Sequence, residues 1–370
     1  MKQARVVFIS PHLAVRDYHG GCAYAAAILE ELHAAGCEIL HVWLADLRGR
    51  RPFRVPLLPG GGKIKIPGAL ALGRWVIPLP FARPHQGTFL RRLSASVQPA
   101  LAILDRAPTA AGWEKHPDCP AWVLTIDSLH QRASRYEAHG FEKDFEHVDA
   151  TREQALLARA DGIIAIQDDE ARLFQAMLPK VPVVTVPYPV SSDPLPLELS
   201  IPGSLLFIGG SAAHNVDGIQ WFVRETLPLI LREQPEAILE IAGTVGNAVP
   251  DHPAIRKLGR VGDLRPLYQR AQLCIAPLRF GTGLKIKVVE AMGYGRPVVG
   301  TPVAAEGFAD LPAALAAVAE QPEALAQAIV DLLRDESLRR AAVARQFDWV
   351  RRHVEAGAAI QPLLEQIRKA

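Results

Sequence analysis

The chain contains little cysteine, and what it has is scattered. Four of its 370 residues are cysteines, and no CxxC or CxxH spacing relates them. They are Cys22, Cys37, Cys119 and Cys274. A disulfide framework or a zinc site would need paired or clustered ligands. We therefore interpret these cysteines as buried small apolar residues, in a protein of a reducing, cytoplasmic compartment.

The chain also lacks a long hydrophobic run. No stretch approaches the roughly 20 uninterrupted apolar residues that a membrane-spanning helix needs. The N-terminal residues MKQARVVFISPH reach a strand-like run at once, without the apolar region of a signal peptide. We expect a cytoplasmic protein, attached at most peripherally to the inner face of the membrane.

An acidic motif for a metal ion is missing as well. Asp168, Asp169 and Glu170 follow an apolar strand pattern, where acidic residues favour the first turn of a helix. No Asp-X-Asp motif occurs in a suitable loop elsewhere. The sequence thus predicts no metal site and no cofactor.

Alternating strand and helix patterns fill most of the chain. A length of 370 residues with 49% hydrophobic residues predicts two domains with well-filled cores. Helical patterns separate most of the short apolar runs, which indicates α/β domains with parallel sheets covered on both faces. Five prolines between positions 187 and 202 indicate a linker. We predict an N-terminal Rossmann-like domain over 1–190, joined by the last helix at about 350–370, and a C-terminal one over 203–349.

Positive charge is concentrated near the N-terminus. Residues 1–115 hold 15 Lys and Arg against 7 Asp and Glu, an excess of 15 − 7 = 8 in a chain whose net charge is only +2. Arg48, Arg50, Arg51 and Arg54 stand among apolar residues. This pattern favours an anionic partner, which is a lipid headgroup, a polyprenyl phosphate or nucleic acid, and the alternative is a solvated loop surface.

The strongest functional pattern is PLRFGTGLKIKVVEAMGYGRPVVGT, residues 277–301. A buried strand is predicted at Leu273–Ala276, followed by the glycine loop Gly281–Gly283. We predict that a helix begins at Leu284 with Lys285 and Lys287 in its first turn. A helix start offers unpaired N–H groups and a positive dipole end to an anion, and glycine allows close approach.

One face of this helix joins the loop to two charged side chains. At 100° per residue, Gly283, Lys287 and Glu290 fall within about 80° of one another. Val288, Val289 and Met292 point away from this face, into the core. A helix start that binds phosphate and a Glu290 side chain that binds ribose hydroxyls would together fit a nucleotide diphosphate. The alternative is a strand–loop–helix unit with a surface pair between Lys287 and Glu290.

This run resembles the donor-binding signature of the retaining glycosyltransferases of family 4, the glycosyl transferases group 1. The resemblance extends more faintly over nearly the whole chain. The matching positions in EAMGYGRPVVGTPVAAEGF are Glu290, Ala291, Met292, Gly295, Pro297, Val298, Val299, Thr301 and Gly307.

The resemblance implies the GT-B fold and an activity. In GT-B proteins two Rossmann-like domains face a central cleft, and the last helix crosses back to the first domain, with Trp349 as an expected anchor. The glutamate matching Glu290 holds the donor ribose, and the loop before it, which includes Thr282, Leu284 and Lys285, holds the diphosphate.

Further positions match the family in the first domain. Gly20 and Gly21 open its first helix, where the family's glycine loop approaches the donor phosphates. His130 resembles a histidine that faces the transferred sugar. Asp127 and Arg132 lie beside it, after the strand predicted at 122–126, and we place them on the acceptor side. The alternative for Asp127 is a helix cap.

In the second domain, the resemblance assigns two more loops to the donor. Gly210, Ser211 and Asn215 follow the first strand, and Arg260 and Val261 match the loop that holds the base. The chain departs from the family in two places. Ala212, Ala213, His214 and Asn215 stand where many members place an arginine and a lysine, and Thr282 stands in place of a glutamate.

We interpret the sequence as a retaining glycosyltransferase of the hexosyltransferase type, using a nucleotide-diphosphate sugar. The residues expected to carry catalysis are His130, Lys287 and Glu290, with phosphate neutralisation shifted to Lys285 and Lys287. The acceptor is expected to be a glycan, a lipid-linked sugar or a small molecule in surface polysaccharide or glycoconjugate synthesis, and no nucleic acid is expected. Two alternatives stay open, a nucleotide-sugar 2-epimerase and an inactive nucleotide-sugar-binding protein.

Overall fold

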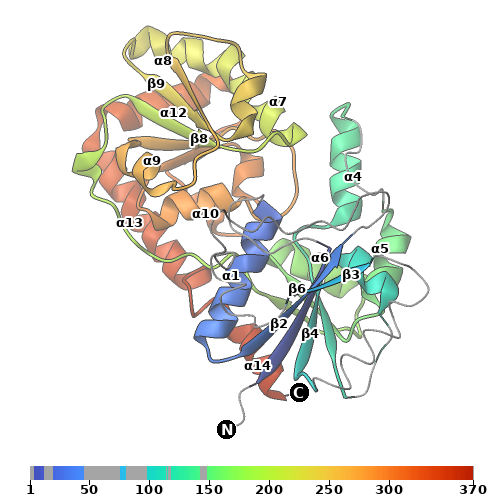
Figure 1. Ribbon diagram of the computed structural model, residues 1–370. Coiled ribbons are helices and arrows are strands. Elements are labelled where there is room, and N and C mark those ends of the chain that lie inside the picture. Colours follow the sequence, from blue (N-terminus) through green and yellow to red (C-terminus); the bar gives the residue numbers. More distant parts are fainter. Residues whose placement is uncertain are drawn as a thin grey trace, which may run out of the picture. The chain divides into compact units, whose positions relative to one another are not determined.

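The structure is a computed structural model (Figure 1). It describes residues 4–11, 20–45, 76–80, 98–113, 115, 118–141 and 148–369, with the backbone alone at 43–45 and 76–80. The described residues form two compact units. The first unit consists of the described residues within 1–130, 147–189 and 357–370. The second unit consists of the described residues within 131–146 and 190–356. The last helix thus lies with the first unit, whereas residues 131–141, which we placed in the first domain, lie with the second.

The first unit contains a parallel sheet. Its seven strands have the order β3-β2-β1-β4-β5-β6-β7. The chain enters at β1, moves outward to β3 and returns to β4 beside β1, so the strand order reverses between β1 and β4 (Figure 1). The strands are Arg5–Ser10 (β1), Glu38–Ala45 (β2), Val76–Pro80 (β3), Leu101–Asp105 (β4), Ala121–Leu124 (β5), Gly162–Ala165 (β6) and Val183–Thr185 (β7).

Helices alternate with these strands, as the sequence pattern predicts. A 3-10 helix over Ala107–Gly112 follows β4. The α-helices are Gly20–Ala34 (α1), Leu129–Ala138 (α4, of which the residues after His130 lie with the second unit), Ala150–Leu157 (α5), Asp168–Met177 (α6) and Gln361–Lys369 (α14).

The second unit contains a six-stranded parallel sheet in the order β10-β9-β8-β11-β12-β13. Its strand order reverses between β8 and β11. The strands are Ser204–Ile208 (β8), Ile238–Ala242 (β9), Ile255–Gly259 (β10), Leu273–Ala276 (β11), Val298–Gly300 (β12) and Ala317–Val318 (β13).

The helices of the second unit include one irregular stretch. A π-helical turn at Phe222–Thr226 stands between two α-helices of this unit. Short 3-10 helices cover Leu197–Leu199, Thr244–Ala248 and Pro302–Ala305. The α-helices are Ala213–Trp221 (α7), Leu227–Glu233 (α8), Arg265–Arg270 (α9), Ile286–Gly293 (α10), Leu311–Ala314 (α11), Pro322–Arg334 (α12) and Glu336–His353 (α13).

The central strands are buried on both faces. Every residue of β4, β5, β11 and β12 is buried. Such strands appear in the sequence as continuous apolar runs rather than alternating ones. This explains why the strand positions could be predicted to within about two residues.

The end of the chain differs from the expectation for Trp349. The helical pattern after Ser337 forms two helices, with a break between His353 and Gln361. Trp349 is fully buried inside the second unit, where its ring lies 5.3 Å from that of Phe308 and its indole N–H donates to Asp310 at 2.8 Å. It therefore contributes to the second unit's own core.

One expectation lies outside the described residues, namely the basic segment with Arg48, Arg50, Arg51 and Arg54. Within the part of the chain that the structure describes, no helix is long and apolar enough to cross a membrane. In that part no group of three or more His, Cys, Asp or Glu side chains is arranged to hold a metal ion. The four cysteines are buried, and no disulfide bond joins any two of them.

Candidate functional site

The fold brings together two loops that the sequence analysis assigned to the donor. The carboxyl ends of the neighbouring strands β8 and β11 form the switch point of the second sheet, which is where open parallel sheets bind ligands. Gly209 and Gly210 follow β8, and Gly281 and Gly283 follow β11. The loop after β8 leads into the start of α7, and the loop after β11 leads into the start of α10.

The loop before α10 depends on its two glycines. Gly281 and Gly283 have φ angles of 138° and 70°, which other residues rarely adopt. The helix begins at Ile286, two residues later than predicted, because Lys285 is the N-cap and has a non-helical ψ of 86°. The side chain of Leu284 is buried, so only its backbone can face a ligand.

Lys287, in the first turn of α10, lies at the meeting point of the two loops. Its Nζ donates to Oδ1 of Asn215 at 2.6 Å and lies 4.3 Å from the ring centroid of Phe207. Nδ2 of Asn215 in turn donates to the carbonyl of Gly210 at 3.2 Å. Burial, reinforced by the charge of Lys285, lowers the pKa of Lys287 from 10.5 to about 7. An anion beside Nζ would favour its charged form.

Lys285 has different surroundings. Its buried Nζ donates to the carbonyl of Gly283 at 2.9 Å and lies 3.5 Å from Oε2 of Glu306. Arg135 donates to that same oxygen at 2.6 Å. Because the amine of Lys285 already contacts the carbonyl of Gly283 and the carboxylate of Glu306, Lys287 is the stronger candidate for neutralising a ligand phosphate.

Glu290 is held by a tyrosine that the sequence analysis missed. The hydroxyl of Tyr268, on α9, donates to Oε2 of Glu290 at 2.8 Å. Tyr268 is fully buried and stacks on Tyr294, with 4.6 Å between ring centroids. Burial and the charge of Glu290 raise the pKa of Tyr268, so its hydroxyl stays protonated. No motif links these residues, which are 22 positions apart.

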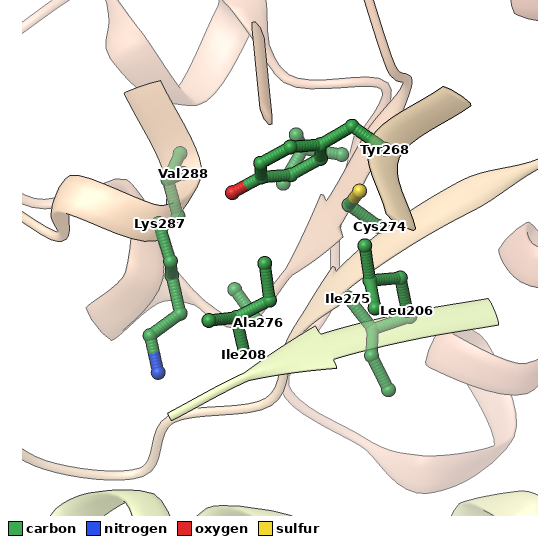
Figure 2. A pocket seen from close by; sticks show the side chains of 9 residues that line it. Leu206, Ile208, Tyr268, Cys274, Ile275, Ala276, Lys287 and Val288 are labelled. Atoms are coloured by element: carbon green, nitrogen blue, oxygen red, sulfur yellow. The ribbon is translucent and has the colours of Figure 1, made fainter. Parts of the chain in front are cut away.

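A small cavity adjoins these groups. Figure 2 shows Tyr268 and the side chain of Lys287 beside aliphatic residues of β8, β11 and α10. Val288, which lines this cavity, is buried together with Val289 and Met292, as predicted. Because its walls are mostly apolar, we interpret the cavity as packing behind the site rather than as the ligand position.

His214 stands where the family resemblance suggests a basic residue. Its Nδ1 lies 2.9 Å from the hydroxyl of Tyr136, and the ring of Phe280 contacts both aromatic side chains edge-on. Burial, followed by the charge of Lys287, lowers the pKa of His214 to about 3. His214 is therefore neutral at physiological pH and supplies no charge for a phosphate.

The remaining predicted positions of the second unit lie in loops at the same strand ends. Ser211 is exposed, as is Arg260, while Val261 is partly buried. The N–H of Gly243 donates to the carbonyl of Gly259 at 2.6 Å, which fixes the loop after β10 beside the one after β9. Thr282, which replaces the family's glutamate, is partly buried in the glycine loop.

The first unit contains most of the other predicted positions. Gly20 and Gly21 are the first residues of α1, and Asp127 is buried in the loop after β5. His130 lies in the first turn of α4, with its Nδ1 2.6 Å from Oε2 of Glu153. The sequence analysis did not single out Glu153, because α5 lies more than 20 residues further along the chain.

Arg132 is placed differently from the expectation. It lies with the second unit, and its guanidinium carbon is 5.6 Å from the ring centroid of Tyr136. The predicted domain bounds include Arg132 in the first domain, whereas the structure groups it with the second unit, and its role on the acceptor side stays a prediction. The sequence could not reveal this, because the division between the units falls inside α4.

Solved structures define the class of fold. The chain superposes on sucrose-phosphate synthase from Thermosynechococcus elongatus with a TM-score of 0.67 at 16% identity, covering 99% of both chains. The pneumococcal O-GlcNAc transferase GtfA, in complex with UDP and GlcNAc, gives 0.66 at 11% identity, covering 100% of this chain and 99% of that one. S. aureus TarM, in a complex that includes UDP, gives 0.59 at 12% identity, with 75% of this chain and 57% of that chain covered. These likenesses show the GT-B fold, as predicted.

A family match adds to the fold. Residues 202–335 match the family described as glycosyl transferases group 1. The match covers the glycine loop, Lys287 and Glu290, so the resemblance of this run to the glycosyl transferases group 1 is confirmed, and family 4 and a retaining mechanism stay predictions. A curated relative, an uncharacterized 44.6 kDa protein in the cps region of Klebsiella pneumoniae, is 28% identical over 117 residues. That alignment covers 28% of this chain and 30% of the relative, less than a third of its length.

Proposed function

We propose that the protein is a retaining glycosyltransferase that moves a sugar from a nucleotide-diphosphate sugar to an acceptor. The observation that carries the proposal is the arrangement at the β8–β11 switch point. There the glycine loop, the start of α10 and the amine of Lys287 lie together, and Glu290 follows one turn further along the same helix. These are the groups that a nucleotide diphosphate requires.

Each group has a separate task in the proposed transfer. The N–H groups at the start of α10 and the amine of Lys287 stabilise the negative charge that grows on the departing diphosphate. Glu290 accepts hydrogen bonds from the ribose hydroxyls. His130 contacts the transferred sugar, as the family resemblance implies. Because helix dipole and lysine supply the positive charge, we propose that the transfer needs neither a metal ion nor a cofactor.

For the nucleotide we propose UDP, because GtfA and TarM have UDP in their structures. For the acceptor we propose a glycan, a lipid-linked sugar or a small molecule of surface polysaccharide synthesis, in keeping with the cps-region relative. The basic residues before position 116 would hold the protein near an anionic membrane surface.

Calorimetry with UDP, followed by incubation with UDP-glucose and UDP-GlcNAc, tests the proposal. We expect UDP to bind and the donor to be hydrolysed slowly without acceptor, equally well in EDTA. An α-linked donor should yield an α-linked product, as NMR of the anomeric proton would show. Absence of binding to any nucleoside diphosphate would contradict the proposal.

A binding protein without activity is the second candidate. The observation in its favour is His214, which is neutral and buried where many family members have a basic residue. Such a protein would bind UDP-sugars without hydrolysing them. Donor hydrolysis measured at saturating UDP-sugar therefore separates the two candidates.

We expect the affinity for UDP to fall as the pH rises from about 7 to 9. In the free protein Lys287 loses its proton through this range, since its pKa is about 7, whereas a bound diphosphate favours the charged amine. Binding at pH 8 should therefore take up close to one proton. His214 stays neutral throughout, and Lys285 keeps its contact with Glu306. Calorimetry in two buffers of different ionisation enthalpy measures the uptake, and equal enthalpies in both would contradict it.

We expect Gly209→Ala to weaken UDP binding several-fold while the fold is kept. A Cβ at this position would lie 3.2 Å from Cγ of Asn215 and 3.3 Å from Nζ of Lys287, so the pair must shift. Gly262→Ala is the matched comparison, because a Cβ there also meets no atom within 4 Å. Equal UDP affinities for the two variants would show that the position of the Asn215–Lys287 pair does not matter for binding.

A further inference from the structure

Glu153 binds the start of a helix to which it does not belong. This residue of α5 has a side chain that is only 1% exposed. Its Oε1 accepts the N–H of Leu129 at 2.9 Å, and its Oε2 accepts the N–H of His130 at 3.0 Å. Glu153 therefore caps the first turn of α4 from 23 and 24 residues away along the chain.

The same carboxylate also contacts the imidazole of His130. Nδ1 of His130 lies 2.6 Å from Oε2 of Glu153, and the hydroxyl of Ser128 lies 3.1 Å from Nδ1 and 3.4 Å from that oxygen. Because both carboxylate oxygens already accept backbone N–H groups, the proton in the 2.6 Å contact belongs to the imidazole. A neutral ring with its proton on Nδ1 has its lone pair on Nε2.

Capping alone does not require this arrangement. Asp127 and Ser128 directly precede α4, and both are residue types that cap helices through their own side chains. Unlike such a local cap, the carboxylate of Glu153 also orients the ring of His130 and selects its tautomer. The side chain of His130 keeps 19% of its surface exposed, so part of the ring remains accessible.

We propose that Glu153 is the positioning residue of His130. It holds the imidazole with the proton on Nδ1, so that Nε2 is the atom offered to a sugar hydroxyl as a hydrogen-bond acceptor. The orientation and tautomer of the His130 ring are inferred from the structure of the first unit alone. Their use in sugar transfer rests on the function proposed above.

The tautomer can be measured directly by NMR. In ¹⁵N-labelled protein, long-range ¹H–¹⁵N spectra distinguish protonated from unprotonated ring nitrogens, and His130→Gln identifies the signals. We expect Nδ1 to be protonated and Nε2 unprotonated in the neutral ring. In Glu153→Gln the carboxamide can donate to Nδ1, so we expect the other tautomer to appear. A wild-type ring with its proton on Nε2 would overturn the proposal even if Glu153→Gln failed to fold.

Glu170→Gln is the matched control. Glu170 is a second buried carboxylate at the same turn, and it accepts the N–H of Ser128 at 3.2 Å. Its replacement removes a comparable buried charge, yet we expect the tautomer of His130 to stay as in the wild type. A change of tautomer equal to that in Glu153→Gln would show a general loss of structure and would overturn the specific role.

Kinetics then separate the inference from the proposed function. Glu153→Gln should lower kcat for the donor by roughly 10-fold, while the affinity for UDP, which lacks the sugar, stays unchanged. A changed tautomer with an unchanged kcat would overturn the positioning role. The His130 tautomer could be as expected in the wild type and in Glu153→Gln while the wild type does not bind UDP. That result would contradict the proposed function but would leave the positioning of His130 by Glu153 supported.

Discussion

Lys287→Met is expected to make the protein more stable and much less active. Burial of the amine disfavours its charge, and methionine fills a similar volume without that cost. The variant leaves Oδ1 of Asn215 without its lysine donor, which offsets part of the gain. We expect a net increase in the free energy of unfolding of about 1–2 kcal/mol. If Lys287 stabilises the leaving diphosphate as proposed, its loss should lower kcat by about 100- to 1000-fold.

The gain in stability should depend on pH in a defined direction. The folded-state pKa of Lys287 is about 7, below the unfolded value of 10.5. Between these values the unfolded chain binds more protons, so the wild type becomes more stable as the pH rises. The advantage of Lys287→Met should therefore be largest below about pH 7 and shrink towards pH 10. Urea unfolding at pH 6, 7.5 and 9 would measure it, and a constant difference would contradict the assigned pKa.

Lys285→Met is the control for charge alone. The amine of Lys285 binds the carbonyl of Gly283 and lies near Glu306, so its removal should destabilise the fold. The two lysine variants are therefore expected to change stability in opposite directions. If Lys285→Met reduced kcat more than Lys287→Met, the lysine that serves the diphosphate would have been assigned wrongly.

Much of the fold was predictable because its signals are local. The strands β4, β5 and β11 are continuous apolar runs in the sequence, since both faces of each sheet are covered. The glycine loop was equally visible, because Gly281 and Gly283 adopt φ angles that favour glycine. The buried face of α10 followed from helical periodicity alone.

The parts that could not be predicted depend on contacts between distant residues. Tyr268 and Glu153 are such cases, because each reaches its partner from another helix and neither stands in a motif. The start of α10 was placed at Leu284, since the sequence does not show that Lys285 folds back onto Gly283. Arg132 was assigned to the wrong unit because helix propensity does not reveal which core a helix packs against.

Glu290→Gln is expected to weaken UDP binding by about 10- to 100-fold with little loss of stability. Glutamine keeps the shape of the side chain but loses the charge, and hydrogen bonds to charged groups contribute roughly 1.5–3 kcal/mol each. If these bonds go to the ribose, the loss should disappear with 2′,3′-dideoxy-UDP. Calorimetry with both nucleotides tests this, and an equal loss for both would show that Glu290 does not bind the ribose.

Tyr268→Phe should reproduce part of this effect through Glu290. Phenylalanine keeps the stacking on Tyr294 but cannot donate to Oε2 of Glu290, so the carboxylate loses one of the bonds that orient it. We expect UDP to bind several-fold more weakly to Tyr268→Phe. In the Glu290→Gln background the same change should cost less, because residues in direct contact couple by about 0.5–3 kcal/mol. Fully additive losses in this double-mutant cycle would mean that Tyr268 acts on the nucleotide by some route other than Glu290.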